Sequence, residues 1–170
     1  MKHRLLLLSL VLALTSISAS AQMSKFKALF LFNFAKNISW PENSTEKYFL
    51  VTVIGDNELA SELKELAKVR KVGAQQMIVK EASTVDKQMD NSQIIYLAQS
   101  KSSLMPMLAS FQKGNSTLLV GANDGLCAQG AGISFVIAGG KLKFQICPGN
   151  IKEHGLTLAQ KLVYLGIEVQ

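Results

Sequence analysis

The sequence predicts a single α/β domain, in which a mixed, largely parallel central sheet is flanked by helices. One observation behind this prediction is that buried-type strands alternate with helical segments between residues 47 and 124. Another is a β-hairpin in the C-terminal region, at residues 132–147, which adds antiparallel strands. The third is length, because the 149 residues that follow a short export segment fit one domain of ordinary size.

Residues 1–21 have the three-part layout of a secretory signal peptide. Lys2 and Arg4 form a basic start, a mostly apolar run extends through Leu14, and small residues end the segment at Ala21. The alternative is a transmembrane anchor, but the apolar run is well short of the about 20 residues that a spanning helix needs. We therefore predict export, cleavage after Ala21 and a mature domain of residues 22–170.

Charge and cysteine content describe the exported chain further. Without Lys2 and Arg4, 16 basic and 12 acidic side chains remain, which is a net charge of +4. The basic residues are spread along the chain rather than clustered, so no nucleic-acid partner is predicted. The two cysteines, Cys127 and Cys147, would reach a compartment in which disulfides persist.

A strongly apolar helix is predicted from Lys25 to about Ile38. Ser24 can cap its start, and it ends before Pro41 because the residue preceding a proline is pushed out of the helical region. One stripe of the helix is expected to pack inward: Phe26, Leu29, Phe30 and Phe34. Further apolar side chains lie outside that stripe: Leu31, Phe32, Ala35 and Ile38. Such a helix must be covered on more than one side.

Three alternations of strand and helix follow. Residues 47–56 are typical of a central strand that is buried on both faces, because polar side chains hardly alternate with apolar ones. Asp56 or Asn57 can cap the next helix, whose leucines follow helical spacing. The remaining segments are assigned in the same way: strands at 75–82, 93–100 and 116–124, and a helix at 102–114.

The C-terminal third changes character. Two strands meet at Gly139-Gly140, which suits a tight turn that needs positive φ at both central residues. The resulting register pairs Ala138 with Lys141, and by continuation Ile137 with Leu142, Phe135 with Phe144 and Ile133 with Ile146. A final helix is predicted from a capping box at Thr157 and Gln160, with Leu158, Leu162 and Leu165 on one face.

The same register places Gly132 opposite Cys147 and brings the loop at 125–131 close to the end of the second strand. A disulfide between Cys127 and Cys147 is therefore a candidate, if the two Cα atoms lie about 4.4 to 6.8 Å apart. The alternative is that both are small buried hydrophobic residues. The glycine-rich loop itself is interpreted as a turn, because a hairpin follows it and not the helix that a phosphate loop requires.

Motifs that would indicate catalysis or metal binding are not found in the sequence. There is no G-x-S-x-G elbow, no Walker loop and no H-E-x-x-H segment. The mature chain has one histidine, His154, and no zinc-type cysteine spacing. We therefore predict no enzymatic activity, no metal site and no cofactor.

Polar residues at the carboxyl ends of the predicted parallel strands form a candidate small-ligand crevice. Ligands in open α/β sheets bind outside these ends. The residues concerned are Asp56, Asn57, Gln99, Ser100, Asn123 and Asp124. The alternative is that these residue types are present only because turns and helix caps favour them.

Several stretches together resemble one known family. They are "KALFLFNFAKNISWP", with Lys27 and Phe34 ahead of Trp40-Pro41, the strand ending "VIGDN", the strand "STLLVG", the hairpin "GISFVIAGGKLKFQI" and the closing "GLTLAQKLVYLGIEV". This whole-chain pattern is similar to the YfiR-like family of bacterial periplasmic proteins. The resemblance implies a small α/β domain in the periplasm, without known enzymatic activity, that represses a membrane-anchored diguanylate cyclase by binding its periplasmic sensor domain.

One departure from the family limits what can be carried over. The family commonly has Asn-Pro where this chain has Cys147-Pro148, and many relatives have an apolar residue at the position of Cys127. The resemblance therefore does not imply redox sensing by these two residues.

The leading hypothesis is a regulator that acts by protein contact, because large apolar patches on soluble proteins often mark partner sites. Leu31, Phe32 or Trp40 would then face the regulated inner-membrane sensor or a homodimer mate, unless the helix is wholly buried within the domain. The second hypothesis is a periplasmic small-ligand binder that uses the crevice. A hydrolase of unrecognised type is the third, and it has no motif behind it.

Overall fold

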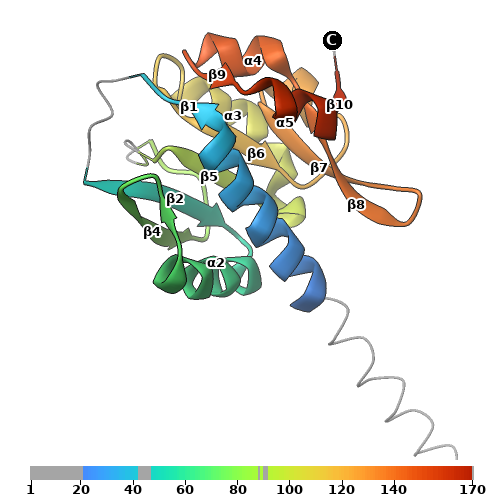
Figure 1. The fold of residues 1–170 in the computed structure, drawn as a ribbon. Helices are drawn as coiled ribbons and strands as arrows, with labels where there is room; N and C mark the ends of the chain where they lie inside the picture. Colours follow the sequence, from blue (N-terminus) through green and yellow to red (C-terminus); the bar gives the residue numbers. More distant parts are fainter. Residues whose placement is uncertain (1–20, 42–46, 88, 90–91, 170) are drawn as a thin grey trace, which may run out of the picture.

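The computed structural model describes residues 21–41, 47–87, 89 and 92–169, so the predicted signal peptide lies outside the described residues apart from Ala21 (Figure 1). Most strands belong to one sheet: β2 Tyr48–Ile54, β3 Lys71–Val72, β4 Gln75–Ala82, β5 Ile94–Leu97, β6 Leu118–Gly121, β7 Ile133–Ala138, β8 Lys141–Ile146 and β10 Ile167–Glu168. The order in this eight-stranded sheet is β10-β8-β7-β6-β5-β2-β4-β3. The predicted α/β class and the mixed, largely parallel sheet are confirmed.

The parallel part of the sheet runs from β4 to β7. Strand β2 lies between β4 and β5 and is parallel to both, which is the central position that its unbroken apolar pattern predicts. Strand β6 is parallel to β5 and to β7. The carboxyl ends of β2, β5 and β6 therefore lie along one edge of the fold.

The hairpin of β7 and β8 has the predicted register. Ala138 pairs with Lys141 and Ile133 with Ile146, and the backbone N–H of Cys147 donates to the carbonyl oxygen of Gly132 at 2.9 Å. Gly139 and Gly140 both have positive φ, at 60° and 70°, as the two-residue turn requires.

The N-terminal helix is described over residues 21–37 and lies across one face of the sheet, with α2 on one side and C-terminal segments on the other (Figure 1). Its aromatic side chains meet those of the hairpin, since the Phe34 ring centroid lies 4.9 Å from that of Phe144 and 5.8 Å from that of Phe135. These contacts join the first and last parts of the chain in one core.

The predicted division of this helix into faces is only partly right: Phe34 is fully buried and Phe30 packs, partly buried, against the core. Phe26, expected to be inside, is 46% exposed, whereas Leu31 is 0% and Phe32 is 4% exposed. The buried arc passes instead through Ala28 and Ala35, whose small side chains allow a helix to approach a sheet closely. A stripe of large aromatic residues does not by itself identify the face that meets the sheet.

Helices follow β2 and β5 as predicted, with one change of type, whereas the short helices at 126–129 and 148–153 were not predicted. The helices after β2 are α2 Asn57–Val69, the 3₁₀-helix η1 Gln99–Leu104, α3 Met105–Phe111, the 3₁₀-helix η2 Leu126–Gln129, α4 Pro148–Glu153 and α5 Gln160–Leu165. Asp56 caps α2, as expected. The single helix predicted at 102–114 is divided into η1 and α3, and Pro106 lies in the first turn of α3.

The C-terminal helix is shorter than predicted and has no capping box. Thr157 lies in β9 (Thr157–Leu158), which pairs antiparallel with β1 (Ile38–Ser39) in a separate two-stranded sheet. Because Thr157 and Leu158 pair with β1, their backbone groups are not available for the first turn of a longer helix. The N-cap of α5 is therefore Ala159. Leu165 is 72% exposed and does not share a buried face with Leu162.

Candidate functional site

The site is built at the carboxyl ends of β2 and β5. Directly after β2, Asp56 caps α2, because its Oδ1 accepts the backbone N–H of Leu59 at 3.0 Å. Its second oxygen, Oδ2, accepts the hydroxyl of Tyr96 at 3.3 Å and lies 3.6 Å from Nζ of Lys27. One carboxylate thus connects a helix start, a buried strand and the N-terminal helix.

Tyr96 occupies the centre of this cluster. Its side chain belongs to the fully buried strand β5, and its hydroxyl accepts a hydrogen bond from Nζ of Lys27 at 3.0 Å. Burial raises the pKa of Tyr96 well above the ordinary value, and the charge of Asp56 and the hydrogen bond to it raise it further. Tyr96 is therefore a neutral hydroxyl that relays a hydrogen bond between an ammonium group and a carboxylate.

A hollow of about 390 Å³ opens beside this cluster. Its polar lining consists of Lys27, Gln99, Asn123 and Asp124, and its apolar lining consists of Met23, Ala122, Phe135, Val136, Ile137 and Leu142. Lys27 belongs to both the cluster and the hollow. The lining combines one cation and several amide or carboxylate groups with apolar side chains, which is the usual composition of a small-molecule site.

The structure brings together only some of the predicted crevice residues. Asn123 and Asp124 line the hollow with Gln99, whereas Asp56 is turned toward α2 and Tyr96 and is absent from its lining. Asn57 lines a different, open depression with Glu81 and Lys101, and Ser100 lines neither of these two hollows. The predicted crevice is therefore divided, because the start of α2 turns Asn57 away from the β6 end.

Lys27 and Tyr96 were not among the predicted site residues. Two signals in the sequence could have identified them: a lysine directly between Phe26 and Ala28 in a strongly apolar stretch of helix, and a tyrosine within a buried strand, since a buried hydroxyl needs a hydrogen-bond partner. Neither signal says which partner is chosen, because Lys27 and Tyr96 are 69 residues apart in the chain.

Two of the three predicted partner-contact residues lie in the core. Leu31 and Phe32 are buried within the domain, so a partner could reach them only if the N-terminal helix were displaced. Trp40 is half-buried and packs edge-on against Phe49, with ring centroids 5.0 Å apart. Of the three, only Trp40 retains accessible surface.

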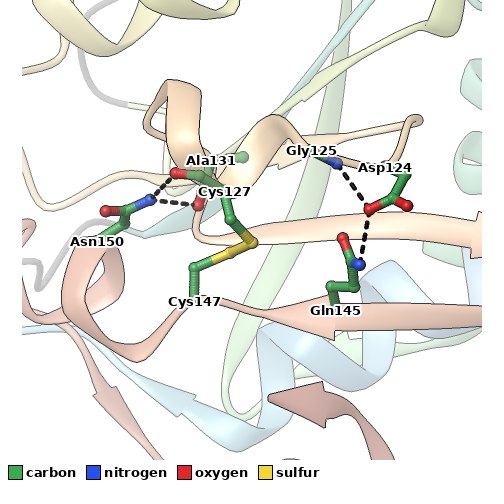
Figure 2. Close-up of a disulfide and its surroundings, with 7 residues drawn as sticks. All are labelled: Asp124, Gly125, Cys127, Ala131, Gln145, Cys147 and Asn150. Carbon is green, nitrogen blue, oxygen red and sulfur yellow. Dashed lines mark hydrogen bonds between the residues drawn. A yellow bond between two sulfur atoms is a disulfide. The ribbon is translucent and has the colours of Figure 1, made fainter. Parts of the chain in front are cut away.

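Cys127 and Cys147 form the predicted disulfide, with their Cα atoms 5.7 Å apart (Figure 2). The bond joins η2 to the end of β8. Asn150 supports the same loop, since its Nδ2 donates to the carbonyl oxygens of Cys127 and Ala131, each at 2.7 Å. The loop that follows β6 is thus attached covalently and by hydrogen bonds to the hairpin and α4.

Asp124, which lines the hollow, is held by two hydrogen bonds. Its Oδ1 accepts the backbone N–H of Gly125 and the Nε2 of Gln145, each at 2.8 Å (Figure 2). Its position is therefore set by β8 as well as by its own turn.

Four large apolar side chains of the described residues are more than half exposed: Ile137 near the end of β7, at 61%, and three others at two further places. In the C-terminal segment of α5 and β10, Tyr164 is 80% exposed, Leu165 is 72% exposed and Ile167 is also exposed. At the end of α2, Val69 is 79% exposed. We call the group of Tyr164, Leu165 and Ile167 the C-terminal apolar patch.

Metal-ligating clusters and membrane-spanning helices can be assessed for the described residues. No group of three or more side chains of the metal-ligating types His, Cys, Asp and Glu comes together within ranges 21–41, 47–87 and 92–169 or at residue 89. In that same part of the chain, no helix has both the length and the apolar character needed to cross a bilayer.

Comparisons with known proteins show which family the chain belongs to. A search among curated proteins gives no match. The family model described as YfiR/HmsC-like matches residues 24–166, which is most of the chain and includes Lys27, Tyr96 and the hairpin. Membership implies a periplasmic regulator of diguanylate cyclase signalling. With this match over most of its length, and with the α/β fold described above, the chain belongs to the YfiR/HmsC-like family.

Proposed function

We propose that this protein is a periplasmic regulator that binds the periplasmic domain of an inner-membrane signalling protein, and that it represses a diguanylate cyclase and so lowers cyclic di-GMP. The observation that carries the proposal is the family match over residues 24–166. Because the match covers nearly the whole folded domain, the regulatory role would belong to the domain itself.

The C-terminal apolar patch is the contact surface that we propose. Tyr164 and Leu165 belong to a helix of six residues, and neither is covered by another described element. Tyrosine is one of the residue types that dominate the binding energy at protein interfaces, and an apolar neighbour such as Leu165 would help to exclude water around it. Trp40 is a second contact candidate, whereas Leu31 and Phe32 are buried in the core.

A capture experiment with a matched control tests this proposal. Tagged mature protein, residues 22–170, is incubated with inner-membrane extracts in mild detergent, and bound proteins are identified by mass spectrometry. Leu165→Glu should lose a membrane sensor that the wild type captures. Val69→Glu, at a similarly exposed apolar position at the end of α2, should still capture that membrane sensor.

Cyclic di-GMP measured in cells completes the test. Deletion of the gene should raise the nucleotide, the wild type and Val69→Glu should restore the low level, and Leu165→Glu should not. Unchanged cyclic di-GMP in the deletion strain would overturn the repressor proposal. Capture that is equally strong for Leu165→Glu would overturn the proposed surface.

A second function, small-ligand binding, is supported by the hollow of about 390 Å³ beside Lys27. Among the described residues that line it, Lys27 is the cation that would fix the orientation of a bound polar group, and the apolar wall would hold the rest of a small molecule. A thermal-shift screen of small metabolites against wild type and Lys27→Met tests this. A ligand that stabilises both proteins equally would argue against this site.

A further inference from the structure

The outer half of the β7–β8 hairpin extends past the strands on either side of it (Figure 1). On one side, β6 pairs with β7 only at Ile133 and Ser134. On the other side, β10 pairs with β8 only at Gln145 and Ile146. Residues 136–143, which we call the hairpin tip, therefore form a two-stranded projection that no other strand of the described residues flanks.

One face of the hairpin tip is apolar. Phe135 and Phe144 lie at its base and pack against Phe34 of the N-terminal helix. Because side chains alternate between the two faces of a strand, the next pair outward on that face is Ile137 and Leu142. Leu142 is half-buried, whereas Ile137 is 61% exposed. The apolar face of the hairpin therefore continues past the cover that the helix gives it.

The hairpin tip is also cationic. Lys141 and Lys143 are exposed and lie on the opposite face, and neither forms a salt bridge among the described residues. The sequence has no aspartate or glutamate from residue 125 to residue 152. Asp124, which precedes this range, is held at the base of the hairpin by Gln145. The tip therefore presents two positive charges and no carboxylate of its own.

We propose that the hairpin tip inserts end-on into the surface of a phospholipid bilayer that carries anionic headgroups. Ile137 and Leu142 would enter the boundary between the headgroups and the acyl chains, and the ammonium groups of Lys141 and Lys143 would stay at the level of the phosphates. Binding of this peripheral kind depends on buried apolar surface and on electrostatic attraction to anionic lipids together. The inference does not rest on the proposed repression of a cyclase.

The composition of the tip favours lipid over a protein partner. Protein interfaces are enriched in arginine and aromatic residues and depleted in lysine, whereas residues 136–143 contain two lysines and neither arginine nor an aromatic residue. A lysine side chain can lie along apolar material and still place its charge in the headgroup layer. The tip is also narrow, and stable protein interfaces bury on the order of 1,200 Å² or more. The C-terminal apolar patch, which includes Tyr164, has the composition that suits protein contact.

The turn limits how deeply the tip can enter. Gly139 and Gly140 connect the two strands outside the ladder that ends at Ala138 and Lys141. Backbone groups without partners are costly in the hydrocarbon region, so the turn must stay where water or headgroups can hydrogen-bond to it. Few apolar side chains are then buried in lipid. The binding is accordingly weak, reversible and dependent on the charge of the bilayer.

Co-sedimentation with vesicles measures this binding. Mature wild type, residues 22–170, is mixed with extruded vesicles of phosphatidylcholine, either alone or with increasing phosphatidylglycerol. Binding should rise with the phosphatidylglycerol content and weaken with added salt, which screens exposed charges.

Two double variants with the same loss of net charge test the position of the lysines. Lys141→Gln with Lys143→Gln should lower the partition constant on the order of tenfold, since each lysine close to an anionic surface contributes about fivefold. Lys80→Gln with Lys113→Gln removes two exposed lysines on β4 and after α3, and should lower it by less than about twofold.

A fluorescent label tests insertion directly. An environment-sensitive fluorophore is attached at Ile137→Cys, or at Val69→Cys as the control at an exposed apolar position of α2. The native cysteines are bonded to each other and do not react with the label. Phosphatidylglycerol vesicles should shift the emission of the label at position 137 to shorter wavelength and leave that at position 69 unchanged. Circular dichroism of each variant verifies the fold, and the label keeps the test decisive if the lysine variants are unstable.

Each outcome bears on the proposal. Binding that requires phosphatidylglycerol, depends on Lys141 and Lys143 and shifts the label at position 137 supports it. Absence of binding to phosphatidylglycerol vesicles overturns it, and so does an equal loss for both pairs of lysines, which would show a response to net charge alone. Binding without a spectral shift at position 137 overturns insertion of the tip. If the Lys141 and Lys143 variant loses a captured membrane protein while wild type ignores protein-free vesicles, the tip contacts protein and the lipid proposal is overturned.

Discussion

The ammonium nitrogen of Lys27 lies 3.0 Å from the hydroxyl oxygen of Tyr96, and this hydrogen bond joins the N-terminal helix to the centre of the sheet. Asp56 completes the cluster from the start of α2. Three elements that are distant in the chain are therefore held together at the end of the sheet where the hollow lies. Changes at these three residues should affect both stability and the shape of that hollow.

Lys27→Met should lower the free energy of unfolding by about 1 kcal/mol, because it removes the donor to Tyr96 and the cation beside Asp56. Lys25→Met, on the exposed side of the same helix, should change it by less than about 0.5 kcal/mol. Urea unfolding followed by circular dichroism gives both values. Equal effects would show that the cluster contributes nothing specific to stability.

Tyr96→Phe should make stability less dependent on alkaline pH. The pKa of Tyr96 is raised in the folded state, and an unfolded tyrosine titrates near 10, so the folded state binds this proton more tightly. The stability that this group contributes is present below about pH 10 and falls above it, by up to about 1.4 kcal/mol per pH unit.

The measurement is urea unfolding of wild type and Tyr96→Phe between pH 8 and pH 11. Their difference should be constant up to about pH 10 and should then shift against the wild type. Tyr164→Phe, at an exposed tyrosine, is the control. A difference that stays constant to pH 11 would contradict the argument.

The faces of the N-terminal helix can be tested by truncation. Leu31→Ala should cost about 2 to 5 kcal/mol, since it removes a fully buried side chain and leaves a cavity. Phe26→Ala should cost much less, because that ring is nearly half exposed. Thermal and urea unfolding distinguish the two. A larger loss for Phe26→Ala would restore the arrangement of faces that the aromatic stripe suggested.

The disulfide should contribute about 3 kcal/mol, the value that chain-entropy arguments give for a loop of this size, since the cysteines are 20 residues apart. Cys127→Ala with Cys147→Ala should therefore lower the melting temperature without loss of the fold. Wild type in a reducing agent should melt at a similarly lowered temperature. If reduction leaves the melting temperature unchanged while the double variant melts early, the loss comes from packing of the buried Cys147 and not from the covalent bond.

Local patterns were sufficient for much of the architecture. The buried run before Asp56 predicts a central strand, the Gly139-Gly140 turn determines every pair of the hairpin, and that register correctly places Cys147 near Cys127. These features depend on neighbours in the chain, or on a turn of two residues, and so short stretches of sequence are enough to predict them.

Tertiary structure decided the rest, because it depends on which surfaces meet. Leu31 and Phe26 are both large and apolar on one helix, and only docking against the hairpin and α2 buries the first and exposes the second. Thr157 has the sequence of a helix cap, yet the neighbouring Ile38–Ser39 segment takes its backbone into a strand pair. The Lys27–Tyr96–Asp56 cluster is a further example. A buried tyrosine hydroxyl needs hydrogen-bond partners, but only the folded chain brings Lys27 and Asp56 within reach of Tyr96.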